Sequence, residues 1–135
     1  MLLHIITAIT EPELQSKLSQ LLKKPDTIVE TVTNHNRLWK TISRQTCDLI
    51  VLSRNLIRDN NIDKIQNFRQ LPEVPLIVVL SEEENEEDRI RLISVGCDAV
   101  LNPKISKKKL GSALNSILDK NILYFWIGYF IRYFF

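Results

Sequence analysis

Three polar side chains, those of Ser53, Ser81 and Lys104, each come shortly after a run of apolar residues with the length of a buried strand. In parallel sheets covered by helices such runs are continuous, and ligands bind beyond the carboxyl ends of the strands. We therefore expect two hydroxyl groups and one ammonium group at one edge of a sheet. This set would suit a small anion or metabolite, with Lys104 as the counter-charge. The alternative is that both hydroxyls bond only to nearby backbone groups.

Other catalytic and cofactor-binding patterns are missing from the sequence. It has three glycines and neither GxxxxGK[ST] nor GxGxxG, so a glycine-rich phosphate cradle cannot be built. Cys47 and Cys97 lie beside predicted strands without a CxxC pair, and His4 and His35 are far apart, so we expect buried free thiols and no metal site. No serine-histidine-aspartate elbow motif is visible. The sequence thus predicts a protein that is not an enzyme and needs no cofactor.

The elements that would position these side chains alternate regularly along the chain. Apolar or β-branched runs predict strands over residues 2–9, 27–33, 47–53, 76–80 and 98–101. Helical spacing predicts helices over residues 10–22, 34–45 and 58–71, a fourth from the acidic run 82–88 to Gly96, and a last over 104–119. Five strand-helix units with short loops predict an α/β fold, a three-layer doubly wound parallel sheet of order 2-1-3-4-5.

Some local features of these helices are also predicted. Thr10 with Glu13 forms a capping-box pattern at the first helix start. Trp39 is expected to anchor its helix in the core, and Ile90 with Ile93 to form the inner face of the fourth helix. Gly96 suits a left-handed helix stop.

The composition changes sharply near the carboxyl end. Eight of the ten aromatic residues lie between Tyr124 and Phe135, so we expect a domain over residues 1–119 and an aromatic-rich extension over 120–135. The extension is shorter than the roughly 20 residues that a membrane-spanning helix requires. It could be a helix packed on the domain or on a second copy, an interfacial membrane anchor, or foreign sequence after a truncation or frameshift. The net charge of +2 is too small to predict a nucleic acid or an anionic membrane as partner, and no recognition helix is visible.

Several short segments, in the right order, resemble the bacterial response-regulator receiver domain over residues 1–119. Glu11-Pro12-Glu13-Leu14 resembles the segment after that family's acidic pair, and Cys47 to Leu52 its central strand. Val74 to Ser81 resembles its fourth strand, and Gly96 to Leu101 the Gly-Ala-Asp before its fifth. The resemblance implies a phosphorylation switch. An aspartate accepts a phosphoryl group, two acids help to hold Mg²⁺, and a hydroxyl and a lysine contact the phosphoryl oxygens.

Carried onto this sequence, the family's pattern is degenerate. The acidic pair falls on Ile9 and Thr10 with Glu11 beside them, the phosphoacceptor on Ser53, the hydroxyl on Ser81, and the lysine on Pro103 with Lys104 displaced by one. Ile9 cannot bind a metal ion, and a single carboxylate makes a poor Mg²⁺ site. Asp48 lies at the opposite end of its strand and cannot replace the acceptor. The resemblance therefore implies a pseudo-receiver without metal.

By this resemblance the chain is expected to be a cytoplasmic, non-catalytic module of a bacterial signalling protein such as a regulator of transcription. It would act through a protein partner or a homodimer and would not bind nucleic acid itself. Membrane contact through the aromatic extension stays an open alternative. In this family the surface of the fourth helix, fifth strand and fifth helix often binds partners, which implies a partner face with Arg89, Cys97, Ala99, Lys107 and Lys108. The rival hypotheses are a small-ligand sensor that uses the strand-end pocket and a phosphoaccepting regulator.

Overall fold

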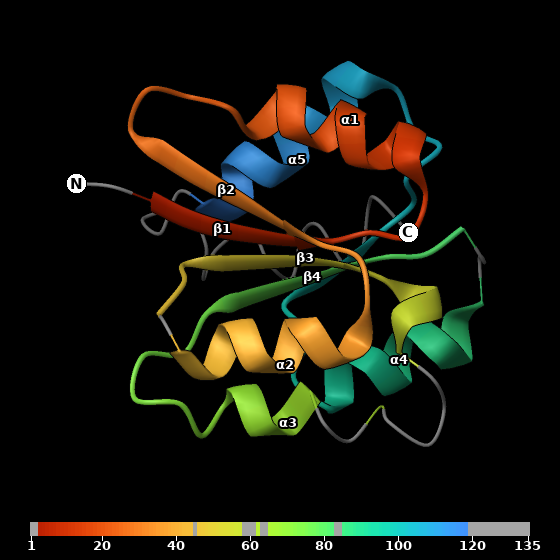
Figure 1. Ribbon diagram of the computed structural model, residues 1–135. Coiled ribbons are helices and arrows are strands. Elements are labelled where there is room, and N and C mark those ends of the chain that lie inside the picture. The colour runs from red at the N-terminus through yellow and green to blue at the C-terminus, as the bar shows by residue number, and fades with distance from the viewer. Residues whose placement is uncertain (1–2, 45, 58–61, 63–64, 83–84, 119–135) are drawn as a thin grey trace.

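The computed structural model describes residues 3–44, 46–57, 62, 65–82 and 85–118 and contains one five-stranded parallel sheet (Figure 1). The strand order is β2-β1-β3-β4-β5, so the predicted fold class and strand order are confirmed. The strands are β1 (Leu3–Ala8), β2 (Thr27–Val32), β3 (Leu49–Ser53), β4 (Leu76–Leu80) and β5 (Ala99–Leu101).

Helices cover both faces of this sheet. They are α1 (Pro12–Leu22), α2 (His35–Arg44), α3 (Ile65–Phe68), α4 (Glu86–Ser94) and α5 (Lys107–Leu118), with a 3₁₀ turn η1 (Arg54–Leu56) after β3. Helices α1 and α5 lie on one face, and α2, α3 and α4 lie on the other (Figure 1). The core is accordingly two buried clusters, one on each side of the sheet. None of the helices in the described part of the chain is both long and apolar enough to cross a membrane.

Strand β3 lies at the centre of the sheet, and all five of its residues are buried. Its side chains alternate between the two clusters, which explains why its sequence is continuously apolar. The register pairs Leu52 with Ala8 of β1 and Ser53 with Leu80 of β4. The carboxyl ends of these strands therefore finish at one edge of the sheet, as the sequence predicted.

Three local predictions were wrong. The N-cap of α1 is Glu11, not Thr10, and it forms no side-chain capping bond; the Thr10 hydroxyl instead donates to Asn55 Oδ1 at 3.0 Å. The helix predicted over residues 58–71 is, within its described residues, the short α3. After α3, the backbone amides of residues 69–71 each donate to the carbonyl oxygen three residues earlier, as in a 3₁₀ turn. The helix therefore ends in a tight turn just before Pro72. Ile90 is 58% exposed, because Leu92, about 200° further round the helix, is the residue that faces the core.

Two other predictions about single residues hold. Trp39 packs against the core and stacks on Phe68, with ring centroids 4.6 Å apart. Gly96 follows α4 with a φ of 121°, in the region that glycine favours. Residues 119–135, which include the whole of the predicted aromatic extension, lie outside the described residues.

Candidate functional site

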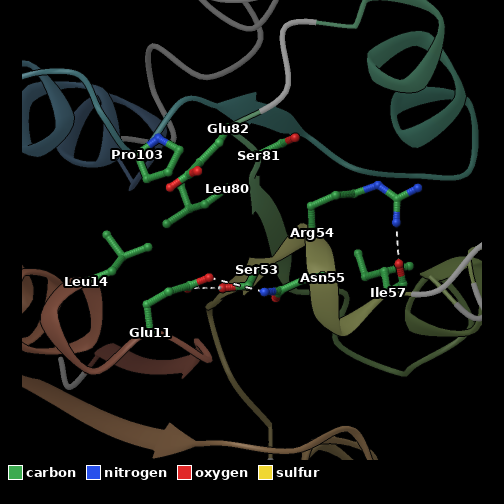
Figure 2. A pocket seen from close by; sticks show the side chains of 10 residues that line it. All are labelled: Glu11, Leu14, Ser53, Arg54, Asn55, Ile57, Leu80, Ser81, Glu82 and Pro103. Carbon is green, nitrogen blue, oxygen red and sulfur yellow. Dashed lines mark hydrogen bonds between the residues drawn. The ribbon is translucent and has the colours of Figure 1, made fainter.

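A pocket of about 500 Å³ opens at the carboxyl edge of the sheet, between the ends of β3, β4 and β5 and the start of α1 (Figure 2). Four of the predicted site residues line it, namely Glu11, Ser53, Ser81 and Pro103. It is also lined by Leu14, Arg54, Asn55, Ile57, Leu80 and Glu82. The topology of the sheet thus brings together residues that are up to 92 positions apart, from Glu11 to Pro103.

Ser53 belongs to a small hydrogen-bonded network on the floor of this pocket. Its side chain is almost completely buried, with 3% of the residue exposed, and its hydroxyl donates to Glu11 Oε2 at 3.4 Å. The Asn55 side-chain amide donates to the other Glu11 oxygen at 3.1 Å (Figure 2). Its oxygen accepts the bond from the Thr10 hydroxyl. Both oxygens of the Glu11 carboxylate therefore already accept hydrogen bonds from the protein.

The residues after β4 and β5 give the pocket less positive charge than the sequence suggested. Ser81 is 6% exposed, and its amide donates to the Leu101 carbonyl at 2.9 Å, which joins the ends of β4 and β5. Lys104 is exposed, is not among the lining residues, and lies 3.8 Å from the Glu82 carboxylate. Because Glu82 lines the pocket and already pairs with Lys104, the expected counter-charge for an anion is engaged outside it.

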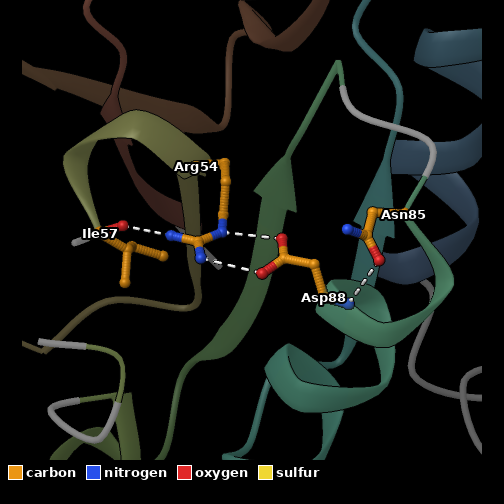
Figure 3. Close-up of polar contacts among 4 residues, drawn as sticks. All are labelled: Arg54, Ile57, Asn85 and Asp88. Atoms are coloured by element: carbon orange, nitrogen blue, oxygen red, sulfur yellow. Dashed lines mark hydrogen bonds and ion pairs between the residues drawn. The ribbon is translucent and has the colours of Figure 1, made fainter. Parts of the chain in front are cut away.

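Arg54, the residue directly after β3, makes the strongest polar contact near the pocket. Its Nε and Nη2 atoms donate to the two carboxylate oxygens of Asp88 in the first turn of α4, each at 2.9 Å (Figure 3). Its Nη1 donates to the Ile57 carbonyl, while the Asn85 side chain caps α4 by accepting from the Asp88 amide at 3.2 Å. The hydrogen bonds from Arg54 hold the pKa of Asp88 below its usual value. This pair fixes the end of β3 to the start of α4.

The site does not resemble a metal centre. Ile9 is buried in the core and Thr10 is exposed, so neither position supplies a carboxylate. Asp48 lies at the amino end of β3, where its Oδ2 accepts from the His4 amide at 2.9 Å. Within the described ranges, no three acidic, histidine or cysteine side chains are grouped so that they could hold a metal ion.

The predicted partner face is only partly at the surface. Cys97 and Ala99 are buried, because they lie at and just before β5 between the sheet and its helices, so these two residues cannot form part of a contact face. Lys107 and Lys108 are exposed, and Arg89 is partly exposed and pairs with Glu86.

Cys47 and Cys97 are free thiols, and burial raises the pKa of each to about 12.

Sequence reasoning did not single out Arg54, Asn55 or Asp88. A local signal existed for the first two, since both directly follow the buried strand that ends at Ser53. Asp88 was seen only as one member of an acidic run. Its pairing with Arg54 spans 34 residues and depends on the fold.

Comparison with known proteins gives a consistent result. The model of the response regulator receiver domain matches residues 5–115. The regulatory protein VirG of Rhizobium radiobacter is 22% identical over 76 residues, which are 56% of this chain and 28% of that protein.

Solved structures match over most of the chain. A response regulator from Thermotoga maritima superposes with a TM-score of 0.77 at 14% identity, over 87% of this chain and 98% of that one. A structure described as an atypical orphan response regulator with a phosphorylation-independent regulatory mechanism matches with a TM-score of 0.72 at 14% identity, over 86% and 95% of the two chains. At these identities the structural likeness concerns the fold alone.

Proposed function

This chain belongs to the response regulator receiver domain family, and we propose that it signals through protein contacts without accepting a phosphoryl group. The observation that carries this proposal is the state of Ser53. A receiver needs a carboxylate nucleophile at the end of β3, and here that position holds a buried hydroxyl bonded to Glu11. Phosphorylation of this hydroxyl would give a phosphate ester and not the acyl phosphate that a carboxylate nucleophile forms.

The surroundings of Ser53 support the same proposal. A hard cation such as Mg²⁺ requires several oxygen ligands, preferably carboxylates. Among the described residues that line the pocket, the carboxylates are those of Glu11 and Glu82. The two oxygens of Glu11 accept from Ser53 and Asn55, and Glu82 pairs with Lys104. The lysine position is Pro103, which has no charge to place on a phosphoryl oxygen. One structural neighbour is described as phosphorylation-independent, so the fold is compatible with such a mechanism.

Incubation of the full chain with acetyl phosphate and Mg²⁺, followed by intact-mass spectrometry, tests the proposal. We expect no gain of the about 80 Da that one phosphoryl group adds. A stable gain in the wild-type chain that disappears in Ser53→Ala would overturn the proposal.

Two controls make a negative result informative. A receiver with its own acceptor aspartate, present in the same mixture, shows that the donor is active. The variant Thr10→Asp/Ser53→Asp puts carboxylates back at two of the family positions. Labelling of this variant alone would show that the missing carboxylates, and not the fold, prevent the reaction.

The pocket itself supports a second candidate, a small-ligand sensor. Its volume of about 500 Å³ falls in the range of small-molecule sites, and four of its ten lining residues are apolar. Thermal unfolding in the presence of a metabolite library tests this function, since a ligand that binds only the folded chain raises the melting temperature. A ligand whose effect is lost in Ser81→Val, in the absence of any protein partner, would favour the sensor over the contact module.

A further inference from the structure

One carboxylate in the pocket at the carboxyl edge of the sheet has no cation beside it. Glu11 accepts hydrogen bonds from the neutral side chains of Ser53 and Asn55, and no cation of the described residues pairs with it. A carboxylate offers about four lone-pair sites, so these two bonds leave Glu11 able to accept more. Its negative charge is therefore available to a cationic group that enters the pocket.

Three basic side chains near the pocket are engaged elsewhere. The Arg54 guanidinium extends toward α4 and binds both oxygens of Asp88 (Figure 3). Lys104 lies 3.8 Å from the carboxylate of Glu82, and Lys17 lies 3.4 Å from two backbone carbonyl oxygens. Neither lysine is among the residues that line the pocket. Within the described part of the chain, the pocket thus presents no free cation to an anionic ligand.

A buried hydroxyl of the pocket also lacks a partner. Ser81 is 6% exposed and lines the pocket, and its hydroxyl forms no hydrogen bond with any other described residue. Buried polar groups in folded proteins are almost always hydrogen-bonded, so this hydroxyl requires water or a ligand as its partner. Ser53 lines the pocket as well, and its oxygen can still accept a bond while its proton is directed to Glu11. The pocket therefore offers two hydroxyl oxygens in addition to the carboxylate.

The rest of the lining is largely apolar. It includes Leu14, Ile57, Leu80 and Pro103, and the last three of these are buried. A ligand that fits the pocket should offer hydrogen-bond donors at one end and hydrocarbon at the other. An alkylammonium ion has this form, because an ammonium group carries a positive charge and three N–H donors and has no acceptor.

We propose that this pocket binds a small alkylammonium ion, with the ammonium group at the Glu11 carboxylate and the alkyl chain against the apolar lining. The proposal rests on the second candidate function, the small-ligand sensor, and names its class of ligand. It reverses the expectation from the sequence, in which Lys104 would attract an anion. A hard metal ion fits less well, because it needs several carboxylate ligands and the other carboxylate of the lining, that of Glu82, already pairs with Lys104.

NMR titration of the full chain tests the proposal with three ligands of one chain length, namely the hexylammonium ion, hexanol and hexanoate. Shifts of the backbone amide signals of Glu11, Ser53 and Ser81 report binding in the pocket. We expect saturable shifts with the hexylammonium ion, and binding at least about tenfold weaker with the other two, which lack the positive charge that strengthens hydrogen bonds to a carboxylate.

The three ligands also separate this proposal from the functions on which it builds. Tighter binding of hexanol or hexanoate in the same pocket would overturn the ligand class and leave the sensor function standing. The absence of saturable shifts with all three would overturn the proposal. The acetyl phosphate experiment does not depend on either result.

The length of the alkyl chain tests the apolar contact. From the ethylammonium to the hexylammonium ion, affinity should rise about fourfold for each methylene group that is buried. Equal affinities along this series would contradict the proposal, because charge alone would then hold the amine. Displacement of the hexylammonium ion by an equal concentration of Mg²⁺ would assign the pocket to a metal ion instead.

A matched pair of variants tests the role of Glu11. Glu11→Gln removes the negative charge and keeps an oxygen that can accept from Ser53, and it should weaken binding of the hexylammonium ion at least about tenfold. Glu13→Gln removes an exposed carboxylate of α1 that does not line the pocket, and it should change the affinity less than about twofold because solvent screens the charge. Equal losses in the two variants would overturn the proposal.

A further variant keeps the test decisive if Glu11→Gln does not fold. Ser81→Ala removes a hydroxyl that has no hydrogen-bond partner among the described residues, so the fold should tolerate it. It should weaken binding of the hexylammonium ion about fivefold through the loss of one acceptor. An unchanged affinity in this variant would contradict the proposed binding mode.

Discussion

At the end of β3, the residue with the most extensive polar contacts is Arg54, the neighbour of Ser53. Its guanidinium group binds both oxygens of Asp88, and the two side chains are each 18% exposed. Bidentate pairs of this kind combine two charge-assisted hydrogen bonds in a fixed geometry. The contact is shielded enough from water to affect the stability of the fold.

Removal of the Asp88 charge should therefore destabilise the protein. We expect Asp88→Asn to lower the free energy of unfolding at neutral pH by about 1 to 2 kcal/mol, measured by urea denaturation. The matched control is Glu87→Gln, which removes an exposed carboxylate from the same helix turn and should cost at most about 1 kcal/mol through the helix dipole. Equal losses in both variants would mean that the pair with Arg54 adds nothing beyond the dipole.

The effect of Asp88→Asn should also depend on pH. The pKa of Asp88 is lower in the folded chain than its usual value, chiefly because of the hydrogen bonds from Arg54. Its stabilising contribution is thus fully present above the unfolded-state pKa of about 3.9, and it is lost as the pH falls through the folded-state pKa. The stability difference between wild type and Asp88→Asn should shrink as the pH is lowered below 4, and a constant difference would contradict the assignment.

At this scale the sequence could predict that Ser53 and Ser81 lie at strand ends, because the apolar runs before them fix where the strands stop. It could not predict the bonds that these ends make. Arg54 finds Asp88 only after β4 and α4 have been placed, and Lys104 turns to Glu82 although strand order alone put it beside the pocket. Contacts between side chains depend on rotamers and loop paths that a pattern of apolar residues does not contain.

At the level of the elements, the turn between α4 and β5 requires glycine at position 96. Gly96 has a φ of 121°, and a Cβ atom there would lie 3.1 Å from Arg69 Nε. We expect Gly96→Ala to lower the free energy of unfolding by about 1 to 3 kcal/mol, because an L-residue is strained in this region. Gly111→Ala in α5 is the contrast, since alanine favours a helix and only the end of the Leu21 side chain stands in the way, at 3.2 Å. Equal destabilisation by both changes would exclude a backbone origin for the effect.

The strands were predicted correctly because five separate apolar runs all indicate the same fold. Predictions that depended on a single motif or on one residue spacing failed. Five apolar runs gave five strands in the predicted order. The first helix start was misplaced because the Thr10 hydroxyl, which matches a capping pattern, instead donates to Asn55 of η1, the turn after β3. Ile90 was assigned to the core from spacing alone, whereas Leu92 is the residue of α4 that is completely buried and Ile90 is exposed.

For the whole molecule, the burial of the strands predicts an order of local stability. All residues of β3 are buried, whereas the edge strand β2 has only Val32 fully buried. Amides of β3 should therefore exchange with solvent only through global unfolding, and those of β2 should also exchange through local opening. Hydrogen exchange followed by NMR or mass spectrometry measures both. Equal protection in the two strands would show that the sheet opens as a single unit.

The strand order also has a consequence for how the chain emerges during synthesis. Strand β4 borders β3 on one side, and its other edge is covered only by the three residues of β5, which follow it in the sequence by about twenty positions. At ribosomal rates the apolar edge formed by Val78, Val79 and Leu80 would stay uncovered for about one to four seconds. Uncovered apolar edges pair with other chains. Nascent chains stalled between β4 and β5 should therefore be the ones that associate with one another or recruit chaperones.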